Sequence, residues 1–264
     1  MVNALLEIEV NAPAQLAVQI GVARSVGLRV DETLQVSREG SPVPWEELGA
    51  PHDGRLWIID ASAGPIRIEY RATVSGRATP QEPEVLEEQV YRRPSRYCQS
   101  DSLGGFASRT FRGVEGPAAQ LAAVSSWVGT QLDYVSGSSD PTDGAVDTLL
   151  ASRGVCRDFA HLTIALLRAL EIPARLAAVY APGLAPMDFH AVVEACVDRA
   201  WYVLDPTSLA PRQSLVRIAT GRDATDTSFV SSYGGNVILS TLRVGATVSG
   251  ALPIDDPHQL VQLS

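Results

Sequence analysis

Cys156 is the residue of this chain best suited to covalent chemistry. It follows Gly154 and begins a segment, residues 155–170, in which apolar residues such as Leu162 and Leu166 recur at helical spacing. The unpaired backbone N–H groups at a helix start carry roughly half a positive charge, which stabilises a thiolate. Gly154 leaves room for the backbone of a substrate to approach. The pattern predicts a nucleophilic thiol, with a buried structural cysteine as the alternative.

His190 and Asp205 are the residues that could activate this thiol, because a thiolate needs a base and the base needs an orienting group. Both lie in a predicted hairpin whose turn is Asp198-Arg199. If that turn has two residues, His190 and Asp205 lie on one face as diagonal neighbours, with Cα atoms about 7–8 Å apart. An odd-length turn would put them on opposite faces. A core histidine and a strand-end cap remain the alternatives.

Other polar residues near Cys156 have simpler explanations. Asp158 stands in the first turn of the predicted helix, where it would interact with the helix dipole and fix the turn. His161 points to a different side of that helix, which favours packing over catalysis. His52 and His258 fall in predicted loops and are weaker candidates.

Composition limits the classes of function. The chain has 264 residues, of which 45% are hydrophobic and 19% charged, so it can bury a substantial core. Its net charge of -9 disfavours nucleic-acid and anionic-membrane partners. An odd number of cysteines, Cys98, Cys156 and Cys196, without CxxC spacing argues against a disulfide framework and favours the cytoplasm. No run of 18 apolar residues predicts a membrane-spanning helix, and the N-terminal segment is unlike a secretory signal.

Three regions follow from the pattern along the chain. Residues 1–85 predict a β-rich domain, residues 86–235 a mixed core and residues 236–264 strands that pack back on the chain. Within the core, residues 117–132 have helical spacing. Predicted strands have the sequences LLEIEV, QLAVQIGVA, GLRVDETLQVS, RLWIIDA, IRIEYRATVSG, ARLAAVYA, FHAVVEACV and AWYVLDP.

Two segments resemble a known family. LLASRGVCRDFAHLTIALLRALEIPARLAAVY resembles the cysteine-helix segment of the transglutaminase-like superfamily, and MDFHAVVEACVDRAWYVLDPT resembles its histidine and aspartate hairpin. The resemblance is close over about residues 115–210. RRPSRYCQSDSL, GRDATDTSF and the strand-rich N-terminal region are similar to bacterial transglutaminase-like cysteine proteases.

The resemblance implies an α+β, papain-like core behind an N-terminal β-sandwich-like domain. It implies that Cys156 is the nucleophile, His190 the general base and acid, and Asp205 the orienter. Val192 departs from the family, which often has tryptophan there, and this is expected to alter the substrate channel. Tyr134 is a weak candidate for the second oxyanion donor, with a packed aromatic residue as the alternative.

The implied function is acyl transfer through a thioester, with a cysteine peptidase or amidase acting on peptides or proteins as the favoured activity. A protein-glutamine transglutaminase and a non-catalytic peptide-binding module of the same fold are the alternatives. A metal site formed by Cys156, His161 and His190 lacks ligand spacing and a fourth partner. No calcium-loop motif is present, so we expect neither cofactor nor metal. Oligomeric state is not readable from the sequence.

Overall fold

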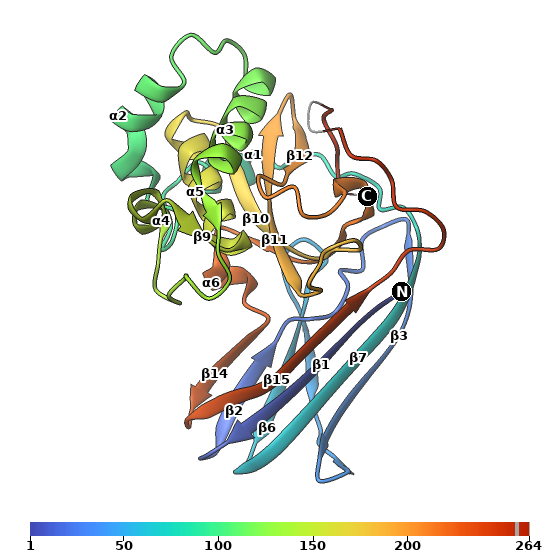
Figure 1. Ribbon diagram of the computed structural model, residues 1–264. Coiled ribbons are helices and arrows are strands. Elements are labelled where there is room, and N and C mark those ends of the chain that lie inside the picture. Colours follow the sequence, from blue (N-terminus) through green and yellow to red (C-terminus); the bar gives the residue numbers. More distant parts are fainter. Residues whose placement is uncertain (257–258, 264) are drawn as a thin grey trace.

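A two-layered β-sandwich forms one end of the molecule (Figure 1). The computed structural model describes residues 1–256 and 259–263. The first sheet has the order β15-β1-β7-β3-β4 and the second has the order β14-β2-β6-β5. Their strands are β1 (Val2–Val10), β2 (Ala14–Val18), β3 (Leu28–Arg38), β4 (Ser41–Pro42), β5 (Glu46–Gly49), β6 (Arg55–Ala61), β7 (Gly64–Gly76), β14 (Val230–Gly234) and β15 (Val237–Ala246).

Alternating side chains build the core of this sandwich. Every second residue of β1 is buried, and β6 and β7 repeat the pattern. Burying one such apolar side chain contributes about 1.5–3 kcal/mol. The buried set includes Leu6, Leu16, Ile59 and Ile68, which come from four strands in both sheets. The strands predicted between residues 5 and 76 are therefore present.

The two last strands complete the sandwich that the first strands begin. β15 pairs antiparallel with β1, and β14 pairs antiparallel with β2. In Figure 1 these red-brown strands lie beside the blue ones. The mixed core is thus inserted between β7 and β14. The domain boundaries given above remain a prediction.

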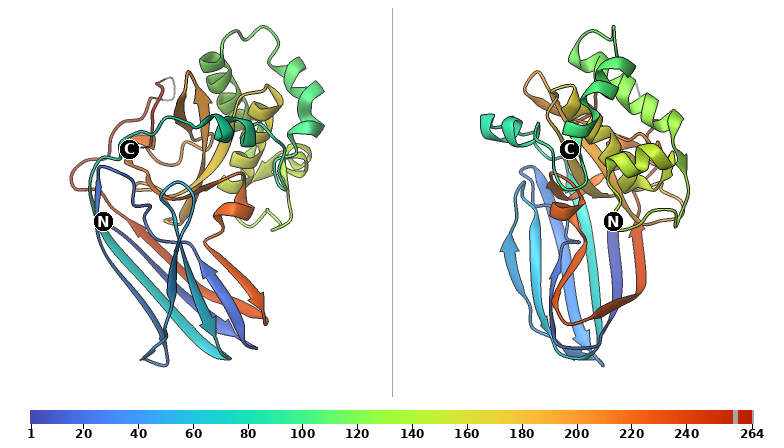
Figure 2. Two further views of the ribbon diagram at one scale, coloured as in Figure 1. Left: turned by 180° about the vertical axis from the view of Figure 1, so that it is seen from behind. Right: turned by 90° about the vertical axis from the view of Figure 1, so that its left-hand side faces the viewer.

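A third antiparallel sheet, with four strands, lies at the centre of the mixed core. Its order is β12-β11-β10-β13. Most of the helices gather on one side of it (Figures 1 and 2). These elements are α1 (Val85–Val90), α2 (Ser100–Thr110), α3 (Pro117–Gln131), β8 (Asp133–Tyr134), α4 (Ala145–Ala151), β9 (Arg153–Gly154), α5 (Cys156–Ala169), β10 (Ala174–Tyr180), β11 (Phe189–Val197), β12 (Ala200–Leu204), the 3-10 turn Arg212–Ser214, β13 (Val216–Gly221) and α6 (Ala224–Thr227).

Helix α5 is the central helix of this layer. Nearly all of its residues after Arg157 are buried, and α2, α3 and α4 pack around it while it rests on β10 and β11. Leu162, Leu166 and Val193 belong to one apolar cluster that joins the helix to the sheet. This arrangement fixes the start of α5 relative to the sheet. The predicted α+β fold is confirmed, although α1, α2 and α6 were not predicted.

Candidate active site

The start of α5 is fixed by a short network around Cys156. Val155 caps the helix, and its backbone N–H donates to Oδ2 of Asp158 at 2.8 Å. Asp158 is 2% exposed, and it also accepts from Ser139 Oγ at 2.9 Å. Asp158 therefore fixes the turn, as predicted. A Cβ at Gly154 would lie 2.6 Å from the Cβ of Asp158, so the glycine makes room for this capping side chain.

The hairpin of β11 and β12 has the predicted register. Asp198 and Arg199 both have positive φ, 49° and 58°, and form the two-residue turn. Val193 pairs with Leu204, which is the pairing that places His190 and Asp205 on one face. Nε2 of His190 lies 2.8 Å from Oδ2 of Asp205.

Asp205 is held on its other side as well. Its Oδ1 accepts from the backbone N–H of Thr207 at 3.0 Å and from the Thr207 hydroxyl at 2.6 Å. The side chains of His190 and Asp205 are 0% and 1% exposed. Each therefore has little freedom to rotate away from the other.

Cys156 lies against the remaining side of the imidazole. Burial lowers the pKa of His190, but Asp205 and the Cys156 thiol outweigh burial and raise it to about 10. Because Nε2 is engaged by Asp205, Nδ1 is the ring nitrogen left for the thiol. Cys156 itself is half-buried and not in a disulfide. The structure thus brings together the three residues that the sequence singled out.

Tyr134 lies beside the same thiol. The short parallel pair of β8 and β9 sets Tyr134 opposite Gly154. The phenol interacts with the backbone N–H and the side chain of Cys156, and its ring contacts Phe159 at 5.8 Å between centroids. Burial and the charge of Cys156 raise the pKa of Tyr134 to about 12, so its hydroxyl keeps a proton to donate.

Arg157 is a contributor that the sequence analysis missed. Its guanidinium donates to the carbonyl of Asp140 at 2.6 Å and to Oδ1 of Asp158 at 3.3 Å. These bonds attach the polar loop, residues 135–143, to the start of α5. The sequence shows only that a basic residue directly follows the cysteine, and this does not identify the residues to which Arg157 donates.

The other histidines lie away from the thiol. His161 is fully buried, stacks on Tyr97 at 5.2 Å and accepts the backbone N–H of Ala224, which confirms its packing role. His52 lies in the sandwich loop before β6 and belongs to the cluster described next, and His258 lies outside the described residues. Residues 1–256 and 259–263 contain no group of three His, Cys, Asp or Glu side chains suited to a metal ion.

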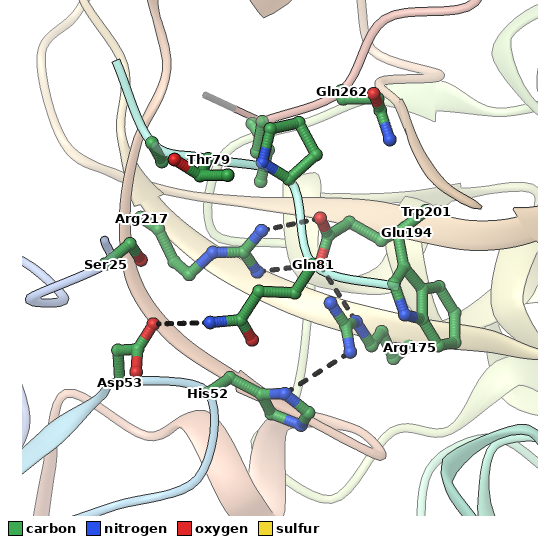
Figure 3. Close-up of a pocket in the computed structure, with 13 residues that line it drawn as sticks. Ser25, His52, Asp53, Thr79, Gln81, Arg175, Glu194, Trp201, Arg217 and Gln262 are labelled. Atoms are coloured by element: carbon green, nitrogen blue, oxygen red, sulfur yellow. Dashed lines mark hydrogen bonds and ion pairs between the residues drawn. The ribbon is translucent and has the colours of Figure 1, made fainter. Parts of the chain in front are cut away.

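A separate polar pocket lies between the sandwich and the core sheet (Figure 3). Its cavity of about 50 Å³ has His52 on the sandwich side and Arg175, Glu194 and Arg217 on the core side. Glu194 accepts from Nε of Arg175 at 2.9 Å and from both terminal nitrogens of Arg217, at 2.6 and 2.7 Å. The guanidinium of Arg175 also stacks on Trp201, 3.9 Å from the ring centroid. Positive and negative side chains are paired in this cluster, so we assign it a structural role at the joint between the sandwich and the core sheet.

Comparison with known proteins decides the family. A family model of the transglutaminase-like superfamily matches residues 104–206, which include Cys156, His190 and Asp205. A solved structure from Cytophaga hutchinsonii, named as a candidate cysteine protease, is 32% identical, with a TM-score of 0.89 over 98% of this chain and 94% of that one. The chain belongs to the transglutaminase-like superfamily. The resemblance to this superfamily that the sequence motifs indicated is therefore confirmed.

Curated relatives in this superfamily match over shorter stretches. An uncharacterized protein of Mycobacterium leprae is 32% identical over 122 residues, covering 42% of this chain and 42% of that protein. An uncharacterized protein of Mycobacterium tuberculosis is 36% identical over 89 residues, covering 34% of this chain and 27% of that protein. The match therefore spans less than half the length of each of these relatives. In the described part of this chain, no helix is long and apolar enough to cross a bilayer.

Proposed function

We propose that this protein is a cysteine peptidase or amidase that works through a thioester acyl-enzyme. The observation that carries the proposal is the arrangement of Cys156 on the first residue of α5 beside His190, whose Nε2 is held 2.8 Å from Asp205. The resemblance to the Cytophaga hutchinsonii structure supports the same class of chemistry. Helix position, base and orienter are the three requirements of an activated thiol.

The proposed acylation uses this geometry. His190 takes the proton of the Cys156 thiol, and the sulfur attacks the carbonyl carbon of an amide. A C–S bond forms as the C–N bond breaks, and the imidazolium of His190 gives its proton to the leaving amine. The raised pKa of His190, about 10, favours the imidazolium that this step needs. Asp205 stabilises that cation and fixes the ring.

Two donors are available for the oxyanion of the tetrahedral intermediate. One is the backbone N–H of Cys156, and the other is the hydroxyl of Tyr134, which lies next to it. Removing one such donor typically costs about 10²- to 10³-fold in kcat. In the free protein the Tyr134 hydroxyl oxygen accepts the backbone N–H of Cys156. When substrate arrives, the hydroxyl would turn and donate to the oxyanion.

The acceptor decides between hydrolysis and transamidation. In hydrolysis His190 removes a proton from water, the oxygen attacks the thioester, and Cys156 leaves as the thiolate. An amine at the same position would give a new amide instead. Cys156 is half-buried and Tyr134 is 45% exposed, so either acceptor can reach the thioester. We favour water, with transglutaminase activity as the second candidate.

Mass spectrometry of the acylated protein tests the proposal. Incubation with peptide and glutamine-amide substrates, with and without an added amine, should give a thioester on Cys156 that water or the amine removes. Cys156→Ser and Cys156→Ala variants serve as matched controls and should lose turnover. Activity should be abolished by iodoacetamide and unaffected by chelators. Full activity in Cys156→Ala would refute the assignment, and peptide binding without any acylation would identify a non-catalytic binding module.

A further inference from the structure

We propose that Asp188 makes this site select substrates that carry a positively charged group next to the reacting carbonyl. The inference rests on the proposed function, because it names the class of substrate for the same thiol. Its physical basis is an exposed carboxylate two residues before His190, which forms no ion pair among the residues that the structure describes.

The backbone places Asp188 on the side of the active site. Phe189, the first residue of β11, packs its ring against Tyr180 and Phe229 at centroid distances of 5.5 and 5.3 Å. Successive residues of an extended chain point to opposite sides. Asp188 and His190, which flank Phe189, therefore lie on the same side of this segment, and His190 contacts Cys156 there.

The charge of Asp188 acts on the groups around Cys156. Burial raises the pKa of Tyr134 most, and the charges of Cys156 and Asp188 add to that effect. Although Asp188 is exposed, partial desolvation raises its pKa, while the backbone N–H of Phe189 and the charge of His190 oppose this. Asp188 therefore borders the cluster formed by Tyr134, Cys156 and His190.

Among the described residues, Asp188 forms no ion pair of its own. Oδ1 of Asp188 accepts the backbone N–H of Phe189 at 2.7 Å. Over the residues that the structure describes, no Arg or His nitrogen lies within 4.0 Å of it. The guanidinium of Arg157, the nearest basic residue along the chain to Cys156, is instead paired with Asp158.

Charge balance at the site then favours a cationic substrate. A thiolate on Cys156 and an imidazolium on His190 cancel each other, and Asp205 is buried behind the histidine. Asp188, which is exposed, remains as the accessible negative charge. A lysine or arginine side chain, or a protonated amine, would meet this carboxylate. The net charge of -9 attracts such groups to the protein as a whole.

Matched peptides test the preference in turnover. The peptides differ only in having lysine, norleucine or glutamate beside the scissile amide, and a fourth arm adds a free amine to the norleucine peptide. An exposed ion pair is worth up to about 1 kcal/mol, so lysine should exceed norleucine in kcat/KM by roughly fivefold at low salt. Asp188→Asn keeps the acceptor for the Phe189 N–H but removes the charge, and it should abolish this preference. Asp31→Asn, an exposed strand residue of the sandwich, should leave it unchanged.

Thiol labelling tests the same charge without turnover. The thiolate of Cys156 attacks the methanethiosulfonate reagent, forming a mixed disulfide and releasing the sulfinate. The ratio of rates for the 2-aminoethyl and 2-sulfonatoethyl reagents should fall about fivefold or more in Asp188→Asn, since both charges respond. Cys156→Ala identifies the labelled residue by mass spectrometry.

The two measurements separate the two ideas. Loss of charge selectivity in labelling, without any peptide turnover in the parent protein, would support the role of Asp188 and refute the peptidase. Turnover with an unchanged lysine preference and an unchanged labelling ratio in Asp188→Asn would overturn the inference and leave the proposed function intact. If only the added amine responds to Asp188→Asn, the selected cation is the acceptor amine, and a cation beside the reacting carbonyl is ruled out.

Discussion

Nε2 of His190 lies 2.8 Å from Oδ2 of Asp205, although the two residues come from different strands and Asp205 lies just beyond the end of β12. The two-residue turn at Asp198 and Arg199 makes this contact possible, because it fixes which face of the hairpin each side chain occupies. The same contact leaves Nδ1 of His190 to Cys156. The chemistry of the thiol therefore depends on the geometry of a turn some distance away from it.

Replacing Asp205 with Asn should lower activity and shift its pH dependence. Asp205 holds the pKa of His190 at about 10, so the imidazolium persists until the pH approaches that value. Without the carboxylate the histidine loses its proton at lower pH, and the alkaline limb of the kcat/KM profile should shift to lower pH. We expect kcat/KM to fall about 10²- to 10⁴-fold. An unchanged alkaline limb in a folded Asp205→Asn protein would argue against the pairing.

The three cysteines should differ in reactivity. Cys156 is half-buried at a helix start, whereas Cys98 is fully buried and burial raises its pKa to about 12. Burial also raises the pKa of Cys196. Iodoacetamide near pH 6 should therefore label Cys156 at least about tenfold faster than the other two. Peptide mapping by mass spectrometry gives the three rates, and equally slow labelling would favour a binding module.

Glu194→Gln should destabilise the joint between the sandwich and the core. Burial raises the pKa of Glu194, but Arg175 and Arg217 outweigh it and lower the pKa to about 2. The neutral variant leaves Arg217 without its carboxylate and Arg175 with only the longer 3.6 Å pair to Glu87, so the free energy of unfolding should fall by about 3 kcal/mol. Urea unfolding measures the change.

Glu82→Gln is the matched control for that experiment. Glu82 makes a 3.5 Å ion pair with Arg199, but its side chain is 80% exposed. An exposed pair contributes little, so this variant should stay within about 0.5 kcal/mol of the parent. Equal effects of the two substitutions would mean that the buried network adds no stability.

His52 should make the protein less stable in acid. Burial and the charges of Arg175 and Arg217 lower its pKa from 6.5 to about 4. Between these two values the unfolded chain binds a proton that the folded chain does not. The free energy of unfolding therefore decreases as the pH falls from 6.5 toward 4. The stabilising effect of the neutral histidine is complete above pH 6.5.

A His52→Gln variant isolates this contribution. It should have a slope of unfolding free energy against pH that is shallower by about 1 kcal/mol per pH unit near pH 5. Urea unfolding at several pH values measures both slopes. His161, whose pKa burial lowers to about 3, adds the same effect in both proteins and cancels in the comparison. Parallel slopes would show that His52 is protonated in the folded state.

Local patterns were enough to predict the elements that carry Cys156 and His190. Helical spacing defined α5, and a two-residue turn between alternating strands fixed His190 relative to Asp205. Both depend on contacts close in sequence. The reason for Gly154 came only from the structure, because it depends on where the side chain of Asp158 folds back.

Contacts between distant segments were not predictable in the same way. Tyr134 reaches Cys156 only through a parallel pair of two-residue strands, which have no sequence pattern of their own. Alternation in β11 predicted burial but not a buried carboxylate at Glu194, since its partners Arg175 and Arg217 come from β10 and β13. The pairing of β15 with β1 likewise joins opposite ends of the chain.

That last pairing has a consequence for biosynthesis. A nascent chain leaves the ribosome with its N-terminus first, so one edge each of β1 and β2 waits for partners until residues 230–246 have emerged. The mixed core between them can fold earlier, because its helices and hairpin are contiguous in sequence. Premature termination before β14 would leave strand edges with unpaired backbone N–H and C=O groups, which promote aggregation. The sandwich, whose first strands are synthesised first, is therefore completed last. Translation through β15 becomes a condition for a soluble product.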